Sequence, residues 1–170
     1  MRPRRIPRAE AVARIQAVYG DADCLMCAIL EGQGPPPLTV HRGTHATVTL
    51  ARFARAPGHL MVLLHDHQTH VAELAPEAWL EACVLAQRGA QVIQRLYDPR
   101  RCYVASLGTD LDHLPMTCPH VHVHVIPIFE SGARPSSVLS WSDGVWDADE
   151  AWWQAERLRF REAWALTEVC

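Results

Sequence analysis

The chain has 170 residues and a net charge of −3 with histidine counted as neutral, so it is long enough for one ordinary domain with a substantial core. No basic tract follows the arginines of the first eight residues, so duplex nucleic acid is not an expected partner. All 16 basic residues are arginines, and the absence of lysine excludes P-loop and Schiff-base chemistry and leaves histidine, cysteine and carboxylate chemistry.

The chain has no run of about 18 apolar residues, so the sequence predicts neither a signal peptide nor a membrane span. We therefore expect a cytoplasmic protein with no membrane partner. The six cysteines are too sparse for a disulfide scaffold. In a reducing compartment, the close pair Cys24 and Cys27 is better explained as two thiolate ligands.

The first half of the chain predicts one short helix and three strands. Apolar residues recur at helical spacing in residues 9–19. Residues 38–41 and 46–53 have the pattern of strands, with a turn at 42–44 between them. Residues 59–64 form a continuous apolar run, which is typical of a central strand in a sheet.

The second half is organised around one long helix. Apolar side chains recur every three or four residues over 76–97, with a proline in the first turn and an Asp-Pro pair at the end. A strand at 102–107 and a loop at 108–119 follow. Near the C-terminus, residues 148–168 predict an amphipathic helix in a tryptophan-rich segment. We interpret these tryptophans as core or interface anchors rather than as a platform for base stacking.

Three histidines, His120, His122 and His124, alternate with valines in a run that ends in Val-Ile-Pro. Valine favours an extended chain, and in a strand every second side chain points to the same face. We therefore expect the three imidazoles on one face and the valines buried on the other. A row of imidazoles can supply a nucleophile, a base or metal ligands.

This alternating triad, with Gly58-His59 on an earlier strand and a long helix between them, resembles the histidine triad (HIT) superfamily of nucleotide hydrolases and transferases. The glycine-histidine strand is similar to that of the bacterial branch that cleaves diadenosine polyphosphates. The resemblance implies an α+β fold, in which an antiparallel sheet carries the 76–97 helix on one face and the triad lies at a phosphate cleft. It also implies a nucleotide as the substrate.

The resemblance implies that His122 is the nucleophile, which attacks the α-phosphorus of a nucleotide and carries a nucleotidyl-histidine intermediate. His124 contacts the phosphate oxygens, His59 flanks the same pocket, and Thr117 meets the phosphate or the leaving group with its hydroxyl. His120 completes the catalytic triad. An imidazole suits the nucleophilic role because its neutral form is nucleophilic near pH 7, and a covalent intermediate divides one displacement into two easier steps.

The resemblance also implies a structural zinc site. Cys24 and Cys27 have the two-residue spacing that lets both thiolates reach one tetrahedral ion. His45 and His120 resemble the histidine ligands of zinc-containing members, so the expected shell is Cys24, Cys27, His45 and His120, and His122 is free to act. The alternative is a pair of buried thiols and a hydrogen-bonded His45.

Three positions depart from the pattern of the family. Met116 stands where the hydrolases usually have glutamine, Ala51 replaces the residue that binds the ribose hydroxyls, and Ile128 replaces an arginine. These departures leave the nucleobase open. Dinucleoside polyphosphates are the leading substrate class, and the sequence does not distinguish hydrolysis, phosphorolysis and nucleotidyl transfer.

Two other functions are compatible with these residues. The triad histidines together can hold a catalytic metal with an open position for water. Alternatively, the chain is a nucleotide-binding module without catalytic activity, which the departures from the family pattern allow. We interpret the other histidines, His65, His67 and His70 after the central strand and His113 in the following loop, as solvated, with His67 and His113 as further candidates for the phosphate pocket.

Two expectations concern the whole chain. We expect a single domain over residues 1–170, with its core at about 24–129 and a tryptophan-rich helical extension over about 135–170. We also expect a symmetric homodimer, because family members pair through helix and strand surfaces and two-fold association is the commonest arrangement of soluble oligomers.

Overall fold

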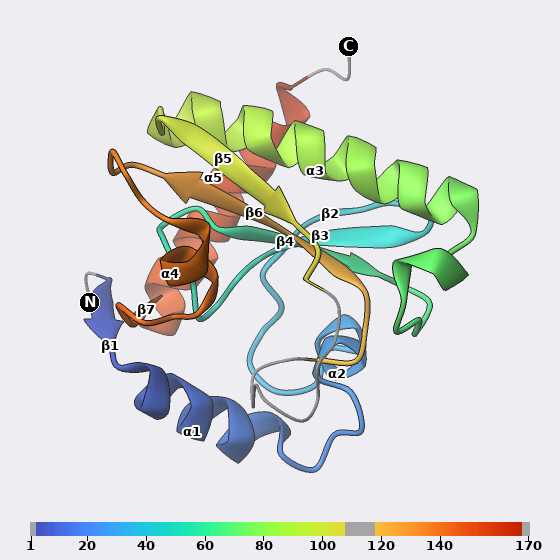
Figure 1. The fold of residues 1–170 in the computed structure, drawn as a ribbon, viewed down its shortest axis with the longest axis horizontal. Helices are drawn as coiled ribbons and strands as arrows, with labels where there is room; N and C mark the ends of the chain where they lie inside the picture. Colours follow the sequence, from blue (N-terminus) through green and yellow to red (C-terminus); the bar gives the residue numbers. More distant parts are fainter. Residues whose placement is uncertain (1–2, 108–117, 168–170) are drawn as a thin grey trace.

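The computed structural model describes residues 3–107 and 118–167 and has an α+β fold (Figure 1). In chain order its elements are β1 (Arg4–Ile6), α1 (Arg8–Tyr19), α2 (Leu25–Leu30), β2 (Thr39–Arg42), β3 (Ala46–Leu50), β4 (Leu60–Leu64), the 3₁₀ turn η1 (Val71–Glu73), α3 (Pro76–Tyr97), β5 (Arg101–Ala105), β6 (His122–Ile128), α4 (Pro135–Leu139), β7 (Val145–Asp147) and α5 (Glu150–Ala165). The main sheet has five antiparallel strands in the order β2-β3-β4-β6-β5. The predicted antiparallel sheet is confirmed.

The long predicted helix and the central strand are both confirmed. Helix α3 has the predicted bounds, with Pro76 at its start and Asp98 in the left-handed region (φ 46°) at its end. Strand β4 lies in the middle of the sheet, between β3 and β6. Its side chains are buried on both faces, with Leu60, Val62 and Leu64 in the core against α3 and Leu63 in a second cluster with Met26 of α2, which accounts for its uninterrupted apolar sequence.

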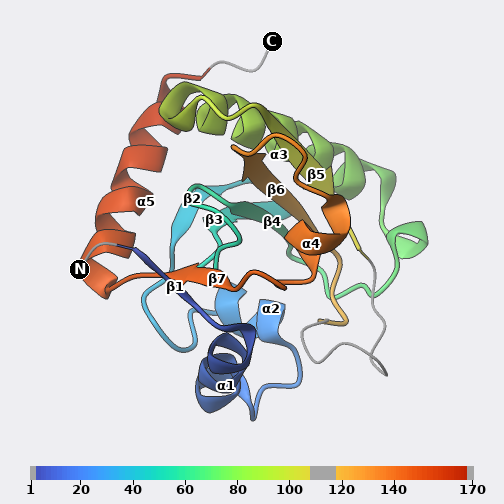
Figure 2. The ribbon, with the colours of Figure 1, turned by 60° about the vertical axis from the view of Figure 1, so that its left-hand side comes forward.

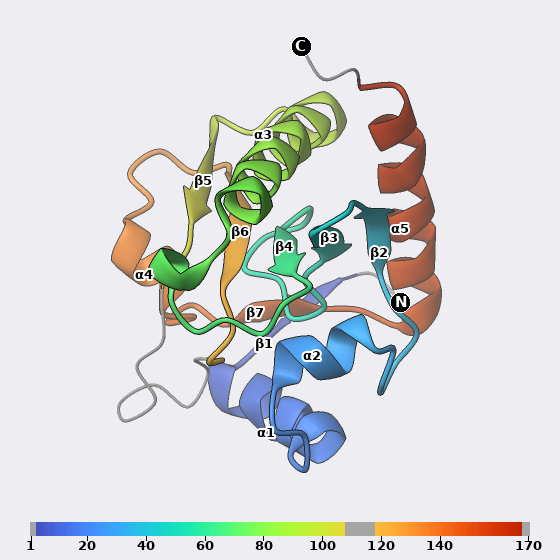
Figure 3. The ribbon, with the colours of Figure 1, turned by 90° about the vertical axis from the view of Figure 1, so that its right-hand side faces the viewer.

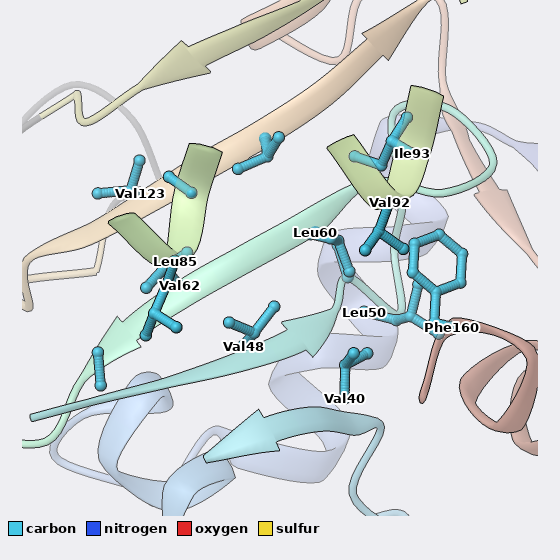
Figure 4. Close-up of a cluster of buried hydrophobic side chains, with 14 of the residues drawn as sticks. Val40, Val48, Leu50, Leu60, Val62, Leu85, Val92, Ile93, Val123 and Phe160 are labelled. Atoms are coloured by element: carbon cyan, nitrogen blue, oxygen red, sulfur yellow. The ribbon is translucent and has the colours of Figure 1, made fainter. Parts of the chain in front are cut away.

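One face of the sheet packs against α3 and forms the main core. Alternate residues of β4, namely Leu60, Val62 and Leu64, belong to this core. Gly89 lets the helix approach closely, because a Cβ there would lie 3.1 Å from Cδ1 of Leu60. Figure 4 shows the strand and helix side chains that meet in this layer: Val40, Val48, Leu50, Leu60, Val62, Leu85, Val92, Ile93, Val123 and Phe160.

Helix α5 confirms the predicted C-terminal helix and packs against β2 and α3 (Figure 3). Trp153, Phe160 and Trp164 of this helix are buried in the same core as the sheet. Trp164 also stacks on His41, with ring centroids 5.1 Å apart. These two tryptophans are thus core anchors, as predicted.

The opposite face of the sheet lies toward α1, α2 and α4 (Figures 1 and 3). Strands β1 and β7 pair as a separate two-stranded sheet and join the first residues of the chain to the segment before α5 (Figure 2). The sequence pattern predicts none of α2, α4, β1 and β7. They have three to six residues each, too few for a periodic pattern to emerge.

No helix within residues 3–107 and 118–167 combines the length and the apolar character that a membrane span requires.

A substitution in α5 tests whether this helix unfolds together with the sheet. Phe160 is 0% exposed, so Phe160→Ala is expected to lower the free energy of unfolding by about 3–5 kcal/mol in urea denaturation. Leu158 on the same helix is 52% exposed, and Leu158→Ala should change the free energy by less than about 0.5 kcal/mol. Equal effects of the two substitutions would contradict a shared core.

Candidate active site

The structure divides the three histidines of the triad between two sites. Strand β6 begins at His122, so His120 lies before the strand and not in it. There the amide of His120 donates to the carbonyl of Cys118 (2.7 Å), and Val121 donates to the carbonyl of Gln68 (2.7 Å). The expectation that His120 belongs to this strand is therefore wrong, because the strand begins only after the turn at Cys118, whereas Val121, Val123 and Val125 are all buried in the core against α3, as expected.

His122 is oriented by the backbone. Its Nδ1 lies 2.7 Å from the carbonyl oxygen of His120. A carbonyl only accepts, so Nδ1 of His122 carries the proton and donates it. In the neutral ring Nε2 is then unprotonated and holds a lone pair. This lone pair makes His122 competent as a nucleophile.

A chain of hydrogen bonds fixes the tautomers of the two neighbouring histidines. The amide of Arg55 donates to Nδ1 of His59 (3.2 Å), so the proton of neutral His59 is on Nε2. That Nε2 lies 3.1 Å from Nδ1 of His124 and donates to it. Nε2 of His124 then carries a proton and donates to Nε2 of His122 over 3.2 Å. The amide of Arg55 at one end and the carbonyl of His120 at the other thus set the direction of all the hydrogen bonds between them.

Burial keeps these rings neutral. It lowers the pKa of His59 from 6.5 to about 3, and the nearby His122 adds to the shift. Burial likewise brings the pKa of His124 well below 6.5, with further contributions from His59 and His122. The pKa of His122 is lowered by burial against the opposing effect of its bond to the His120 carbonyl. Near pH 7 the rings of His59, His124 and His122 are therefore neutral. A nucleophilic imidazole must be in this form.

A cavity of about 680 Å³ opens beside these histidines. His59, His122 and His124 line it from the sheet, and α1, α2, α4 and the segment before β2 contribute the other walls. Most of the lining is apolar, with Val12, Ile15, Tyr19, Ile29, Leu38 and Trp141 among its residues. A cavity of this size and character accommodates a small organic ligand.

Two of the positions that depart from the family pattern can be placed. Ala51 is buried in the wall of the cavity. Ile128 packs with Val138 of α4. Met116, Thr117 and His113 lie outside the described residues.

The second site is a cluster of two thiols and two imidazoles. The ligand atoms of Cys24, Cys27, His67 and His120 all lie within 4.8 Å of one another. Nδ1 of His120 is 3.4 Å from both sulfurs, and Nδ1 of His67 is 3.3 Å from Sγ of Cys27. Nε2 of His120 donates to the carbonyl of Leu64 (2.8 Å), which leaves Nδ1 unprotonated toward the sulfurs.

His67 takes the place in this cluster that the family resemblance predicts for His45. His45 lies in the turn between β2 and β3, where its amide donates to Glu81 (2.8 Å) and its carbonyl accepts from His65 (2.8 Å). Because β4 separates β3 from β6, a residue before β3 is one strand further from His120 than a residue after β4. The antiparallel pairing of β4 with β6 is the signal that favours His67.

His65 and His70 have other surroundings. His65 bonds Thr47 (2.9 Å) and the carbonyl of Thr44 (3.0 Å), and so supports the turn before β3. His70 is exposed. A metal held jointly by all three triad histidines does not fit, because both ring nitrogens of His120 face groups other than His122 and His124.

The HIT domain family model matches residues 36–131 of the chain. No curated protein gives a significant match. Among solved structures, a Zn-bound histidine triad family protein from Mycobacterium smegmatis has a TM-score of 0.64 at 20% identity, covering 85% of this chain and 94% of that one. A hypothetical histidine triad nucleotide-binding protein from Sulfolobus tokodaii has a TM-score of 0.66 at 15% identity, covering 84% and 93%. These similarities show a shared fold.

The buried histidine chain predicts a loss of stability in acid. Between pH 6.5 and about 3, His59 binds a proton in the unfolded chain but not in the folded one. The unfolded state thus holds more protons, and the free energy of unfolding falls as the pH is lowered through this range. We expect His59→Gln to reduce that slope by up to about 1.4 kcal/mol per pH unit, measured by urea denaturation from pH 7 to 4.

The matched control for this slope is Val62→Ala, which removes buried volume but no ionisable group. It should lower stability by a similar amount at every pH. If His59→Gln keeps the wild-type slope, His59 is protonated as readily in the folded protein as in the unfolded one. The conclusion that the buried histidines stay neutral would then be wrong.

Proposed function

The chain belongs to the histidine triad (HIT) family, and from this premise we propose that it is a nucleotide hydrolase or nucleotidyl transferase that acts on an α-phosphate. His122 is the nucleophile, and His124 and His59 assist it. The observation that carries the proposal is the bond from Nδ1 of His122 to the His120 carbonyl. It leaves Nε2 as a lone-pair nitrogen beside a cavity of about 680 Å³.

The proposed reaction has two displacements. In the first, Nε2 of His122 bonds to the α-phosphorus, and the bond from phosphorus to the leaving group breaks. In the second, an acceptor oxygen bonds to phosphorus and the bond to Nε2 breaks, which regenerates His122. With water as the acceptor the reaction is hydrolysis, and with inorganic phosphate it is phosphorolysis.

The neighbouring side chains stabilise charge on the phosphoryl group. The Nε2 proton of His124 points at Nε2 of His122 in the free site, and it transfers its hydrogen bond to a phosphate oxygen when substrate occupies that space. His59 holds His124 in the tautomer that makes this donation possible. His120 contributes its carbonyl to the reaction site, while its ring belongs to the cysteine cluster. We keep Thr117 as the proposed contact to the leaving group.

Dinucleoside polyphosphates, cleaved to nucleoside 5′-phosphoryl products, are the proposed substrate class, and nucleoside phosphoramidates share the same reactive centre. A mainly apolar cavity suits a nucleobase, and the structural neighbour from Sulfolobus tokodaii is described as nucleotide-binding. Turnover of a panel of adenosine and guanosine polyphosphates and phosphoramidates, measured with and without inorganic phosphate, identifies the preferred nucleobase and the acceptor.

His122→Ala tests the nucleophile. We expect turnover of the best substrate to fall by at least about 10⁴-fold, because the covalent route is lost, with folding intact by circular dichroism. Mass spectrometry of the acid-quenched wild-type protein should find a nucleotidyl adduct on His122. His70→Ala, at an exposed histidine outside the cavity, is the control and should retain turnover.

The panel also decides the alternative of a binding module without catalysis. If the wild-type protein binds nucleotides but gives neither product nor adduct across the panel, the enzymatic proposal is wrong.

We further propose a structural zinc ion in the cluster of Cys24, Cys27, His67 and His120. With Zn–S near 2.3 Å and Zn–N near 2.05 Å, an edge from sulfur to nitrogen in a tetrahedral shell measures about 3.5 Å. Three of the four sulfur-to-nitrogen distances in the cluster, 3.3, 3.4 and 3.4 Å, fit that edge. The structural neighbour from Mycobacterium smegmatis is Zn-bound.

Zinc content distinguishes His67 from His45 as the fourth ligand of the proposed site. Zinc content, measured by elemental analysis after dialysis, should be near one ion per chain in the wild type and in His45→Ala. His67→Ala should lose most of it, because a four-ligand shell is opened to solvent. Full retention in His67→Ala with loss in His45→Ala would restore the original assignment.

We also propose a homodimer and a single cytoplasmic domain over residues 1–170. The exposed apolar side chains of Leu80 and Val84 on α3 and of Val104 on the edge strand β5 support an association surface. The burial of α5 in the core of the sheet supports one domain.

A further inference from the structure

A third thiol lies against the cysteine cluster. Sγ of Cys118 is 3.6 Å from Sγ of Cys24, and Cys118 is only 6% exposed. It lies two residues before His120, at the turn that redirects the chain ahead of β6. Cys118 is not part of the four-residue cluster, so no metal role is assigned to its sulfur.

Cys24 has partners on two sides. Its sulfur is 3.4 Å from Nδ1 of His120 within the cluster, and it also accepts the amide of Cys27 at the start of α2 (3.4 Å). On the other side it meets Cys118. A sulfur in a disulfide is no longer a thiolate and cannot serve as a metal ligand. Binding a metal and bonding to Cys118 are therefore mutually exclusive states of Cys24.

We propose that Cys24 and Cys118 form an oxidisable pair whose disulfide opens the metal cluster. The release of metal rests on the zinc part of the proposed function, whereas the disulfide itself does not. The oxidant is a hydroperoxide of small size. It reaches the pair through the active-site cavity, because Cys24 and Cys118 both line that cavity together with His122.

The oxidation balances with hydrogen peroxide as the two-electron acceptor. The thiolate of Cys24 attacks one peroxide oxygen, the O–O bond breaks, and hydroxide leaves, which gives a sulfenic acid. The sulfur of Cys118 then attacks the sulfur of Cys24, the S–O bond breaks, and the proton of the Cys118 thiol leaves with that oxygen as water. Together the two sulfurs give up two electrons, and one disulfide forms.

The geometry favours Cys118 over Cys27 as the resolving thiol. Cys27 is itself a member of the cluster, next to His67 and His120, so a bound metal occupies its sulfur. Cys118 stays outside the shell with its thiol available. The two sulfurs must approach from 3.6 Å to about 2.05 Å for the disulfide to form.

The test uses the full-length, zinc-loaded protein treated with hydrogen peroxide. Zinc release is followed with a chromogenic chelator, and disulfides are mapped by mass spectrometry of non-reduced peptides. The wild type should release zinc as a Cys24–Cys118 linkage appears, and thiol reductant should restore binding. Cys118→Ser should bind zinc equally before oxidation and release it at least about tenfold more slowly. Cys83→Ser, which removes an exposed thiol on α3, is the matched control and should behave as the wild type.

A Cys24–Cys27 linkage, or equal release from wild type and Cys118→Ser, would overturn the proposal. If the wild type binds no zinc, the zinc part of the proposed function fails and the peptide map alone decides the pair. A Cys24–Cys118 linkage in that metal-free protein upholds the pair, and its absence overturns it. If Cys118→Ser does not fold, Cys118→Ala takes its place, and the wild-type map is decisive without either variant.

Discussion

The hydrogen bond from His122 to the backbone carbonyl of His120 sets the protonation of every ring in the cavity. It places the proton of His122 on Nδ1, so Nε2 can accept from His124, which in turn accepts from His59. At the far end, the amide of Arg55 supplies a donor that cannot be reversed. Burial alone would make the rings neutral, but only these two backbone groups choose the tautomer.

His120 connects this chain to the cysteine cluster. Its carbonyl orients His122, its Nε2 is tied to Leu64, and its Nδ1 faces the sulfurs of Cys24 and Cys27. The position of one backbone carbonyl therefore depends on how firmly the ring of the same residue is held. A metal at the cluster would fix that ring and, through it, the position of the carbonyl that orients His122. Opening the cluster would affect the cavity without any direct contact between metal and substrate.

The sequence predicted features that repeat along the chain and missed those that depend on pairing between distant segments. Helix α3 carries its own periodicity and end signals, and β4 carries an uninterrupted apolar run, so both were predictable. Strand β1 has three residues and exists only because β7 pairs with it. The register of β4 and β6 brings His67 into the cluster, and the turn before His120 brings Cys118 against it. The spacing of residues around a motif does not predict either contact.

The two faces of the sheet explain why one fold supports both stability and this site. The face toward α3 is apolar and closely packed, and it supplies the favourable burial that the rest of the molecule depends on. The other face contains imidazoles, which are costly to bury unless each ring nitrogen is hydrogen-bonded. Every ring nitrogen of His59, His124 and His122 has a hydrogen-bond partner. Burial of these rings is therefore costly only for their protonated, charged form. The same burial that makes protonation unfavourable keeps His122, the proposed nucleophile, in its neutral form, and it lowers the stability of the folded protein in acid.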